Sequence, residues 1–319
     1  RSLIVALLNS GKRSIALDLK TAAERERLLP LLQEADVLVE QFRPGVMDRL
    51  GLGYETVKAI NPGIIYCSIT GYGQAGPLSQ VAGHDLNYMA ETGILSLSRG
   101  ADGSPVLPPV LVGDIGGGTM PAVINILLAL RHRDQTGEGC HLDVSITDNL
   151  FAFPYHAVSR GVAYGQWPKA GAERLTGGSP RYQIYRTADN KFLAAAPLEE
   201  KFWRNFLEAI EAPHLRDDAA DPAGVRKEVA GIISARPAQE WMARLHGKDV
   251  CCTLVASVKE AMQDAHFRER GLFARQVAAG ERKIAALPMP VAPQFRLNEP
   301  VAGYPGLGEA NADFGLTQE

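Results

Sequence analysis

Short apolar runs alternate with longer amphipathic stretches through the first half of the chain. The short runs have the length and content of buried strands, and the longer stretches have apolar residues at helical spacing. We expect strands at residues 14–17, 37–40, 64–69 and 142–146, and helices at 21–32, 85–96 and 119–131. Strands that alternate with helices predict an α/β domain with a mainly parallel sheet.

Two of these predicted helices carry more specific signals. Thr21 is followed three residues later by Glu24, which is a capping box at the start of a helix. Residues 119–131 are apolar nearly all round, and such a helix is expected to be buried.

The second half of the chain has a different pattern. Residues 151–180 are rich in Gly and Pro and are typical of a linker. A hairpin at 182–196 and three helices then predict a smaller α+β domain, and the Pro-rich tail after Ile284 should be extended and docked on other surfaces. We therefore divide the chain into a large domain (1–150), a linker (151–180), a small domain (181–275) and a return segment to the large domain (276–319).

The composition narrows the class of protein. A length of 319 residues with 46% hydrophobic and 22% charged residues is typical of a globular protein of two domains. The net charge of −3 argues against nucleic acid as a partner. The longest apolar stretch, 122–130, is interrupted by Asn125 and is too short to span a bilayer, so we expect no membrane partner. The four cysteines form no C-x-x-C pair and are expected to be reduced thiols in a cytoplasmic protein.

The strongest chemical signal is the segment 112–120, in which Asp114 directly precedes the glycines 116–118 and a predicted helix. Glycines allow a ligand to approach the backbone, and the start of a helix favours an anion such as a thioester enolate. A simpler interpretation is that Asp114 only caps the helix. His84 and Glu199 each lie near a predicted helix start, and alone neither would indicate more than a structural residue.

Together these segments resemble the family III CoA-transferase and α-methylacyl-CoA racemase superfamily, and the racemase branch in particular. The family's G-H-D-[IL]-N-Y motif stands at 83–88, and its V-G-D-x-G-G-G motif stands at 112–118. Further family landmarks follow in family order at 11–14, 42–45, 70–73 and 306–309. The resemblance therefore covers nearly the whole chain.

The resemblance implies roles for individual residues. His84 and Asp114 match the racemase's acid/base pair, and Asp85 and Glu199 match carboxylates that support the histidine. Phosphates take charge-assisted hydrogen bonds from Arg and Lys. The positions that would contact coenzyme A are Lys12, Arg13, Lys20, Phe42, Arg43, Arg49, Tyr88, Gly116 and Gly117.

The resemblance also implies an architecture. The large domain should be Rossmann-like, and two chains should form an intertwined homodimer in which one chain's large domain faces the other's small domain. Family chains begin with a further strand–helix unit of roughly 30 residues, which this sequence lacks. We therefore expect the set of coenzyme A contacts given above to be incomplete.

Two reactions are compatible with these residues. A racemase would hold the α-carbon of a 2-methylacyl-CoA between His84 and Asp114, one removing the proton and the other returning it, while amides near Asp114 stabilise the enolate. A transferase would use Asp114 as the nucleophile and carry CoA as an aspartyl thioester. His84 favours the racemase because the transferase branch usually lacks it. An inactive acyl-CoA-binding relative is a third possibility, against which the intact site residues argue.

One other motif points elsewhere. Residues 71–76 match G-x-G-x-x-G after a predicted strand, as in dinucleotide-binding proteins. Pro77 follows at once, and no apolar helix opens at the third glycine as that fingerprint requires. We therefore expect neither a nicotinamide nor a flavin cofactor, and neither reaction calls for a metal.

Overall fold

The computed structural model describes residues 3–100, 102–279, 281–296 and 301–316. The chain divides into two compact units, one formed by Arg1–Pro30 with Ala256–Glu319 and the other by Leu31–Val255. Each unit is described by itself.

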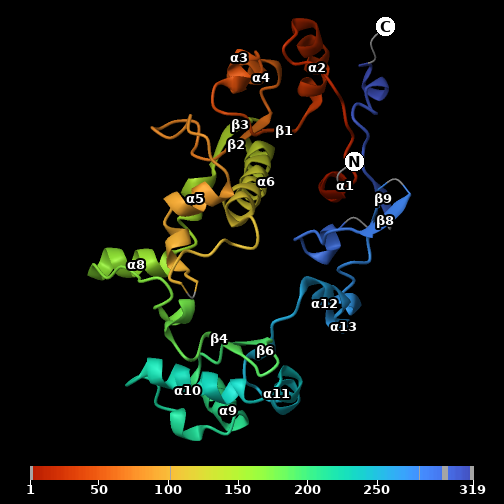
Figure 1. Cartoon of the computed structure of the whole chain (residues 1–319). Coiled ribbons are helices and arrows are strands. Elements are labelled where there is room, and N and C mark those ends of the chain that lie inside the picture. Colours follow the sequence, from red (N-terminus) through yellow and green to blue (C-terminus); the bar gives the residue numbers. More distant parts are fainter. Residues whose placement is uncertain (1–2, 101, 280, 297–300, 317–319) are drawn as a thin grey trace. The chain divides into compact units, whose positions relative to one another are not determined.

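A parallel sheet lies at the centre of the first half of the larger unit (Figure 1). Its strands are β1 (Val37–Glu40), β2 (Ile65–Thr70) and β3 (Cys140–Ser145), in the order β1-β2-β3. Both pairings are parallel, as the alternation of strands and helices predicted. The middle strand β2 is buried along almost its whole length, which explains why most of its residues are apolar.

Short helices connect these strands. They are α3 (Val46–Arg49), α4 (Tyr54–Ile60), α5 (Asp85–Glu91), the 3₁₀ turn η1 (Ile94–Leu97) and α7 (Ile146–Leu150). A π-helical segment η2 (Gly113–Thr119) leads directly into α6 (Met120–Thr136), which lies beside β2 and β3 (Figure 1). Helix α6 ends at Gly137, whose positive φ of 77° only glycine adopts without strain.

The expectation that α6 is buried is wrong for the single chain. Its small residues Ala122 and Ala129 face inward, but Ile124, Leu127 and Leu128 are 57 to 64% exposed. An all-round apolar sequence shows that a helix needs cover, and it does not show that the same chain supplies it.

The helical segment that includes α6 is also longer than its apolar sequence. Helical structure runs without a break over Gly113–Thr136, and these 24 residues are long and apolar enough to cross a membrane by length and composition. The sequence-based estimate considered only the shorter run 122–130 and missed this length.

The second half of the larger unit is an α+β layer (Figure 1). Its antiparallel sheet has the order β4 (Gln183–Arg186), β5 (Phe192–Ala195), β6 (Cys252–Leu254), and three helices, α9 (Glu200–Ala209), α10 (Pro222–Ser234) and α11 (Ala238–Leu245), pack on it. Trp203, Phe206 and Trp241 are fully buried in the resulting core. This layer agrees with the hairpin and the helices expected from the sequence.

The segment expected to be a linker contains regular structure. It forms the ten-residue helix α8 (Tyr155–Tyr164) and a short π-helical turn η3 (Arg174–Gly178).

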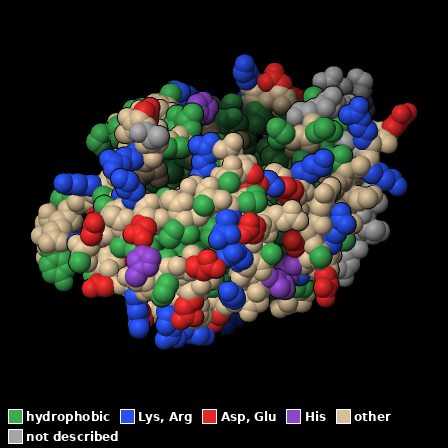
Figure 2. All heavy atoms as spheres, turned by 60° about the horizontal axis from the view of Figure 1, so that its bottom comes forward, with side chains coloured by type: hydrophobic (Ala, Val, Ile, Leu, Met, Phe, Trp, Pro, Cys, Tyr) green, Lys and Arg blue, Asp and Glu red, His purple; other side chains and the backbone are tan. Residues whose placement is uncertain are grey.

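On the face drawn in Figure 2, cationic and anionic side chains are mixed, and no large area there carries charge of one sign.

The smaller unit combines the two ends of the chain. Its helices are α1 (Leu3–Asn9), α12 (Val258–Gln263), α13 (Ala265–Glu269) and the first part of α2 (Ala22–Glu34), and its sheet has the order β8 (Arg282–Ala285), β7 (Gln276–Ala279), β9 (Val301–Gly303). The 3₁₀ turns η5 (Pro293–Phe295) and η6 (Ala312–Phe314) lie in the tail. At the start of α2 the Glu24 amide donates to Thr21 Oγ1 at 3.4 Å, which is one of the two bonds of the predicted capping box, and the Thr21 amide donates to Asp18 O instead of to Glu24.

The strand predicted at residues 14–17 is absent from this unit. The segment is extended, but its backbone groups bond to the tail: Ser14 O accepts from the Ala310 amide, and the Ala16 amide donates to Asn311 Oδ1 at 2.8 Å. One backbone group and the side chain of Asn311 thus replace the neighbouring strand, which an apolar run cannot reveal.

Candidate functional site

Asp114 is held by the start of helix α5. The Asp114 amide donates to Asp85 Oδ1 at 2.8 Å, and Asp85 is a buried carboxylate. Gly113 makes this contact possible, because a Cβ atom there would lie 3.0 Å from the same oxygen. The resemblance implied that Asp85 supports the histidine; the contact observed is with the backbone of Asp114.

His84 lies immediately before α5 and is fixed through its backbone. Its amide donates to Asn87 Oδ1 at 3.1 Å, and its carbonyl accepts from the Asn87 amide at 2.8 Å. The side chain is exposed. His84 is close enough to Asp114 to act electrostatically on that carboxyl group. The structure therefore brings His84, Asp85 and Asp114 together from two segments about thirty residues apart.

The environment of Asp114 favours its protonated form. Partial burial raises the pKa of this carboxyl group, the charge of Asp85 raises it further, and His84 acts in the opposite direction. A carboxylate with a raised pKa is a better proton acceptor near neutral pH than an ordinary aspartate. Such a shift is common at catalytic sites.

Replacing Asp85 by Asn should move the acid limb of the pH–activity profile to lower pH. The change removes a negative charge that raises the pKa of Asp114, while the Asn oxygen can still accept the Asp114 amide. The measurement is kcat against pH for the wild type and the variant. Asp134→Asn, which removes the same charge from an exposed position of α6, should leave the limb in place. A limb that stays fixed or moves upward in Asp85→Asn contradicts this electrostatic role.

His84 lines a cavity of about 300 Å³ together with Phe42, Arg43, Tyr72 and Tyr88. Tyr88 is buried, its hydroxyl donates to Gly83 O at 2.7 Å, and its ring meets Tyr72 edge-on at 5.3 Å. Tyr88 was predicted to contact coenzyme A, and these contacts also make it a support for the backbone just before His84. Asp114 is not among the lining residues of this cavity.

The glycines after Asp114 serve the packing of η2. A Cβ atom at Gly117 would lie 2.6 Å from Ile146 O in α7, and Asn149 Nδ2 donates to Gly117 O at 2.9 Å. A Cβ atom at Gly116 would lie 2.8 Å from the ring of Phe153. The sequence suggested that a ligand approaches both glycines. In the structure, packing against α7 alone is enough to require glycine at position 117.

Amides near Asp114 were expected to stabilise an enolate, and two of them already have partners. The Asp114 amide donates to Asp85, and the Ile115 amide donates to Leu111 O at 3.1 Å. Donors for a developing negative charge must therefore come from other groups.

Gly117→Ala should destabilise the protein by about 1–3 kcal/mol, because the added methyl group meets a backbone carbonyl that cannot turn away. Gly231→Ala is the matched control. Gly231 is exposed within α10, nothing lies near its missing Cβ, and alanine there should stabilise by roughly 0.5–1 kcal/mol. Chemical unfolding of both variants measures the difference. Equal stability of the two variants would contradict the packing role.

The residues that the resemblance assigns to coenzyme A are distributed over both units. In the larger unit, Arg43 lines the His84 cavity, the Phe42 amide donates to Glu40 Oε2 at 2.7 Å, and the Arg49 side chain lies beside Gly45. In the smaller unit, Lys12 donates to Asn9 Oδ1 at 3.0 Å and Arg13 forms a 2.6 Å ion pair with Asp313 and stacks over Phe314. The backbone amide of Lys20 donates to Asp18 Oδ1 at 3.0 Å.

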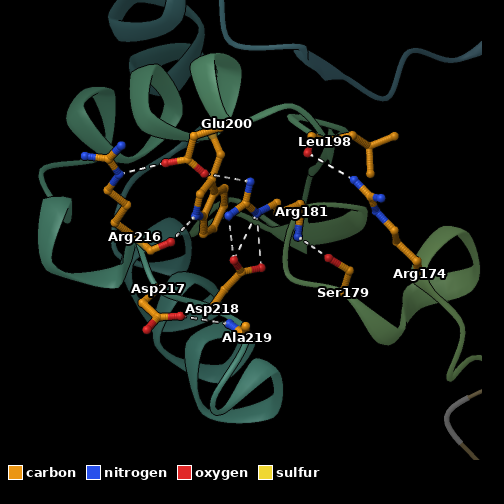
Figure 3. A network of polar contacts seen from close by, with 10 residues as sticks. Arg174, Ser179, Arg181, Leu198, Glu200, Arg216, Asp217, Asp218 and Ala219 are labelled. Carbon is orange, nitrogen blue, oxygen red and sulfur yellow. Dashed lines mark hydrogen bonds and ion pairs between the residues drawn. The ribbon is translucent and has the colours of Figure 1, made fainter.

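Glu199 lies at the start of α9. Its two neighbours, Leu198 and Glu200, are both anchored (Figure 3). Arg174 donates to Leu198 O at 3.2 Å. The Glu200 carboxylate accepts from Arg216 at 2.7 Å and pairs with Arg181 at 3.2 Å, and Arg181 is itself held by Asp218. These contacts fix the backbone on both sides of Glu199.

Glu199 lines a different cavity from His84. This second cavity, of about 570 Å³, is formed mainly by α8, η3 and residues 198–199. No sequence signal indicated it, because most of its walls fall in the presumed linker. Among the residues that the structure describes, no group of three or more His, Cys, Asp or Glu could hold a metal ion.

The sequence matches the model of CoA-transferase family III over residues 1–311. The chain belongs to CoA-transferase family III. It is 34% identical to the α-methylacyl-CoA racemase of Mus musculus over 98% of this chain and 83% of that protein, and 34% identical to the acetyl-CoA:oxalate CoA-transferase of Acetobacter aceti over 82% and 69%. A CAIB/BAIF family protein from Brucella suis has a similar structure, with a TM-score of 0.81 and 28% identity over 98% of this chain and 82% of that one.

These likenesses confirm the family predicted from the motifs and the mixed α/β fold with a parallel sheet. The relatives are enzymes that act on CoA thioesters, so the chain is an enzyme of this family. Racemases and transferases both occur among them, and the choice between the two reactions depends on the site.

Proposed function

We propose that the protein is an α-methylacyl-CoA racemase that transfers a proton at the α-carbon of a 2-methylacyl-CoA. The observation that carries this proposal is the hydrogen bond from the Asp114 amide to Asp85, which holds Asp114 near the neighbouring His84. The raised pKa of Asp114 agrees with a role as a base. Racemisation needs two groups that exchange a proton with one carbon from opposite faces, and an imidazole beside a carboxyl group can do so. The likeness to the mouse racemase over nearly the whole chain supports this choice.

In this reaction one of the two groups removes the α-proton while the C–H bond electrons move into the thioester carbonyl to give an enolate. The other group then delivers a proton to the opposite face. Asp85 holds the backbone of Asp114, and Asn87 holds that of His84, so the backbone that carries each group is fixed before substrate binds. We assign the cavity beside His84, with Phe42, Arg43 and Tyr88, to the CoA part of the substrate.

The second candidate is CoA transfer between carboxylic acids. It is favoured by the equal identity to the acetyl-CoA:oxalate CoA-transferase and by the partly exposed carboxyl group of Asp114. Asp114 would attack the thioester carbonyl and expel CoA as thiolate, which gives a mixed anhydride. The thiolate would then attack the aspartyl carbonyl of the anhydride, which releases the donor carboxylate and leaves CoA as an aspartyl thioester. In this scheme His84 has no chemical role.

The test offers the protein a single enantiomer of a 2-methylacyl-CoA, first alone and then with free carboxylic acids. A racemase yields the opposite enantiomer without any acceptor acid, as chiral chromatography would detect. Formation of a new thioester with an unchanged α-centre would instead assign the transferase.

We further propose that two copies of the chain form the intertwined homodimer of the family. The apolar side chains on α6, including Val123, Ile124, Leu127 and Leu128, are exposed in the single chain, and contiguous exposed apolar patches are typical of interfaces. Light scattering at micromolar concentration should give the mass of a dimer without detergent. A monomer under these conditions contradicts the proposal, and recovery only with lipid or detergent would indicate a membrane contact.

A further inference from the structure

One face of the parallel sheet is polar, although such sheets usually carry apolar side chains on both faces. The strand register pairs Glu40 with Ser68 and Tyr66 with His141, so these four side chains point to the same face of β1, β2 and β3. Side chains on the opposite face, such as Cys67, pack on α6. The polar face therefore has a reason other than the hydrophobic core.

The four residues of the polar face line a third cavity, of about 230 Å³. Three of them have hydrogen-bond partners. Ser68 Oγ and His141 Nε2 are bonded to each other at 3.0 Å, and the Tyr66 hydroxyl donates to Leu52 O at 2.9 Å. Glu40 differs from the other three.

Glu40 is a buried carboxylate that is only half satisfied. The residue is 9% exposed, and its Oε2 accepts from the Phe42 amide at 2.7 Å. Among the residues that the structure describes, Oε1 has no hydrogen bond or ion pair, and it is not one of the enclosed atoms without a partner, so it faces the open space of the cavity. A buried charge is costly unless a counter-charge compensates it. The position beside Oε1 therefore suits a cation.

The rest of the lining also favours a cation. Asp48 and Glu55 add two carboxylates, against the single guanidinium of Arg43. Burial, and then the charges of Glu40 and Asp48, raise the pKa of the Tyr66 phenol above its usual range, so both carboxylates lie near this hydroxyl. Asp48 and Arg43 are exposed to solvent, which leaves Glu40 as the strongest determinant of charge in the cavity.

Aromatic rings form another part of the wall. Tyr54, Tyr66 and His141 contact one another, with ring centroids 5.1 to 5.9 Å apart. The faces of such rings attract cations, and Lys58 Nζ already lies 5.6 Å from the Tyr54 ring. Since no group of His, Cys, Asp or Glu within the described residues could hold a metal ion, the lining suits an organic cation better than a metal.

We propose that this cavity binds a small organic cation, a primary ammonium or a guanidinium on a short apolar stem, whose N–H groups donate to Glu40 Oε1. The hydrogen bond is charge-assisted, and the stem would lie against the aromatic rings. The cavity is separate from the one beside His84, and Arg43 is the residue that lines both. Neither racemisation nor CoA transfer requires this ligand.

The test uses n-butylammonium chloride, with n-butanol as the neutral molecule of the same shape. By calorimetry and ligand-detected NMR, the wild type should bind the alcohol at least about tenfold more weakly than the ammonium. Glu40→Gln keeps an oxygen for the Phe42 amide and removes the charge, so it should weaken ammonium binding by about ten- to a hundredfold, the range for one hydrogen bond to a charged group. Because this variant also loses an uncompensated buried charge, its thermal midpoint without ligand should not fall.

Asp48→Asn removes an exposed carboxylate from the same lining and should weaken binding by only about two- to fivefold. Glu208→Gln, at an exposed position of α9, is the control and should bind as the wild type does. Equal ammonium binding by the wild type and Glu40→Gln, or equal binding of the alcohol and the ammonium, would overturn the proposal. Displacement of the ammonium by potassium chloride at constant ionic strength would show a site for an inorganic cation only and would overturn it too. If Glu40→Gln did not fold, unchanged binding by Asp48→Asn would refute the site.

Discussion

Asp114→Asn should reduce racemisation and CoA transfer alike, by at least about a hundredfold. An amide is neither a base nor a useful nucleophile, and general acid–base catalysis contributes about 10²- to 10⁴-fold. The fold should survive, because Asp85 binds the backbone amide of residue 114 and not its side chain. Activity is measured with both assays, and stability by chemical unfolding.

Asp134→Asn provides the control for this change. Asp134 lies in the exposed last part of α6, on the same continuous helical segment as Asp114. Its replacement should leave both activities at the wild-type level. If Asp114→Asn were folded and retained activity within tenfold of wild type, Asp114 would not be the reacting group under either scheme.

His84→Ala should separate the two reactions. In a racemase it removes one of the two proton-transfer groups, so racemisation should fall by about 10²-fold or more. Exchange of the α-proton from one enantiomer can continue through Asp114, because a single base suffices to remove and return a proton on the same face. Chiral chromatography and mass spectrometry in heavy water measure the two processes separately.

A transferase would respond differently to this variant. His84 would only line the cavity, so His84→Ala would retain substantial CoA transfer. His132→Ala, at an exposed position of α6, is the matched control and should behave as wild type in both assays. Unchanged racemisation in His84→Ala would remove the histidine from the mechanism.

Local signals in the sequence predicted local structure well. The capping box at Thr21 and the hairpin before α9 involve residues a few positions apart, and their geometry follows from those residues alone. The prediction of a strand at residues 14–17 was wrong, because an apolar run does not show whether a neighbouring strand or the side chain of Asn311 will bond to its backbone. The prediction that α6 is buried was wrong for the single chain, because an apolar face can be covered by another molecule.

The candidate site was predictable only where its residues lie in local motifs. The motifs indicated His84 and Asp114, but the bond from Asp85 to the Asp114 amide joins segments 29 residues apart and has no local signature. The glycine run suggested a ligand, whereas the position of α7 makes Gly117 necessary for packing. The cavity that Glu199 lines was not predicted, because most of its walls lie in a segment whose Gly and Pro content indicated only a linker.

The central claim is that His84 and Asp114 exchange a proton with the α-carbon of a bound thioester. The most direct test incubates the protein with a 2-methylacyl-CoA in heavy water and follows deuterium at the α-carbon by mass spectrometry. The account predicts that one deuterium enters each molecule as the enantiomers interconvert, and that Asp114→Asn stops the interconversion and leaves at most exchange through His84 from one enantiomer. A wild-type protein that transfers CoA between acids while the α-carbon keeps its original hydrogen would contradict it.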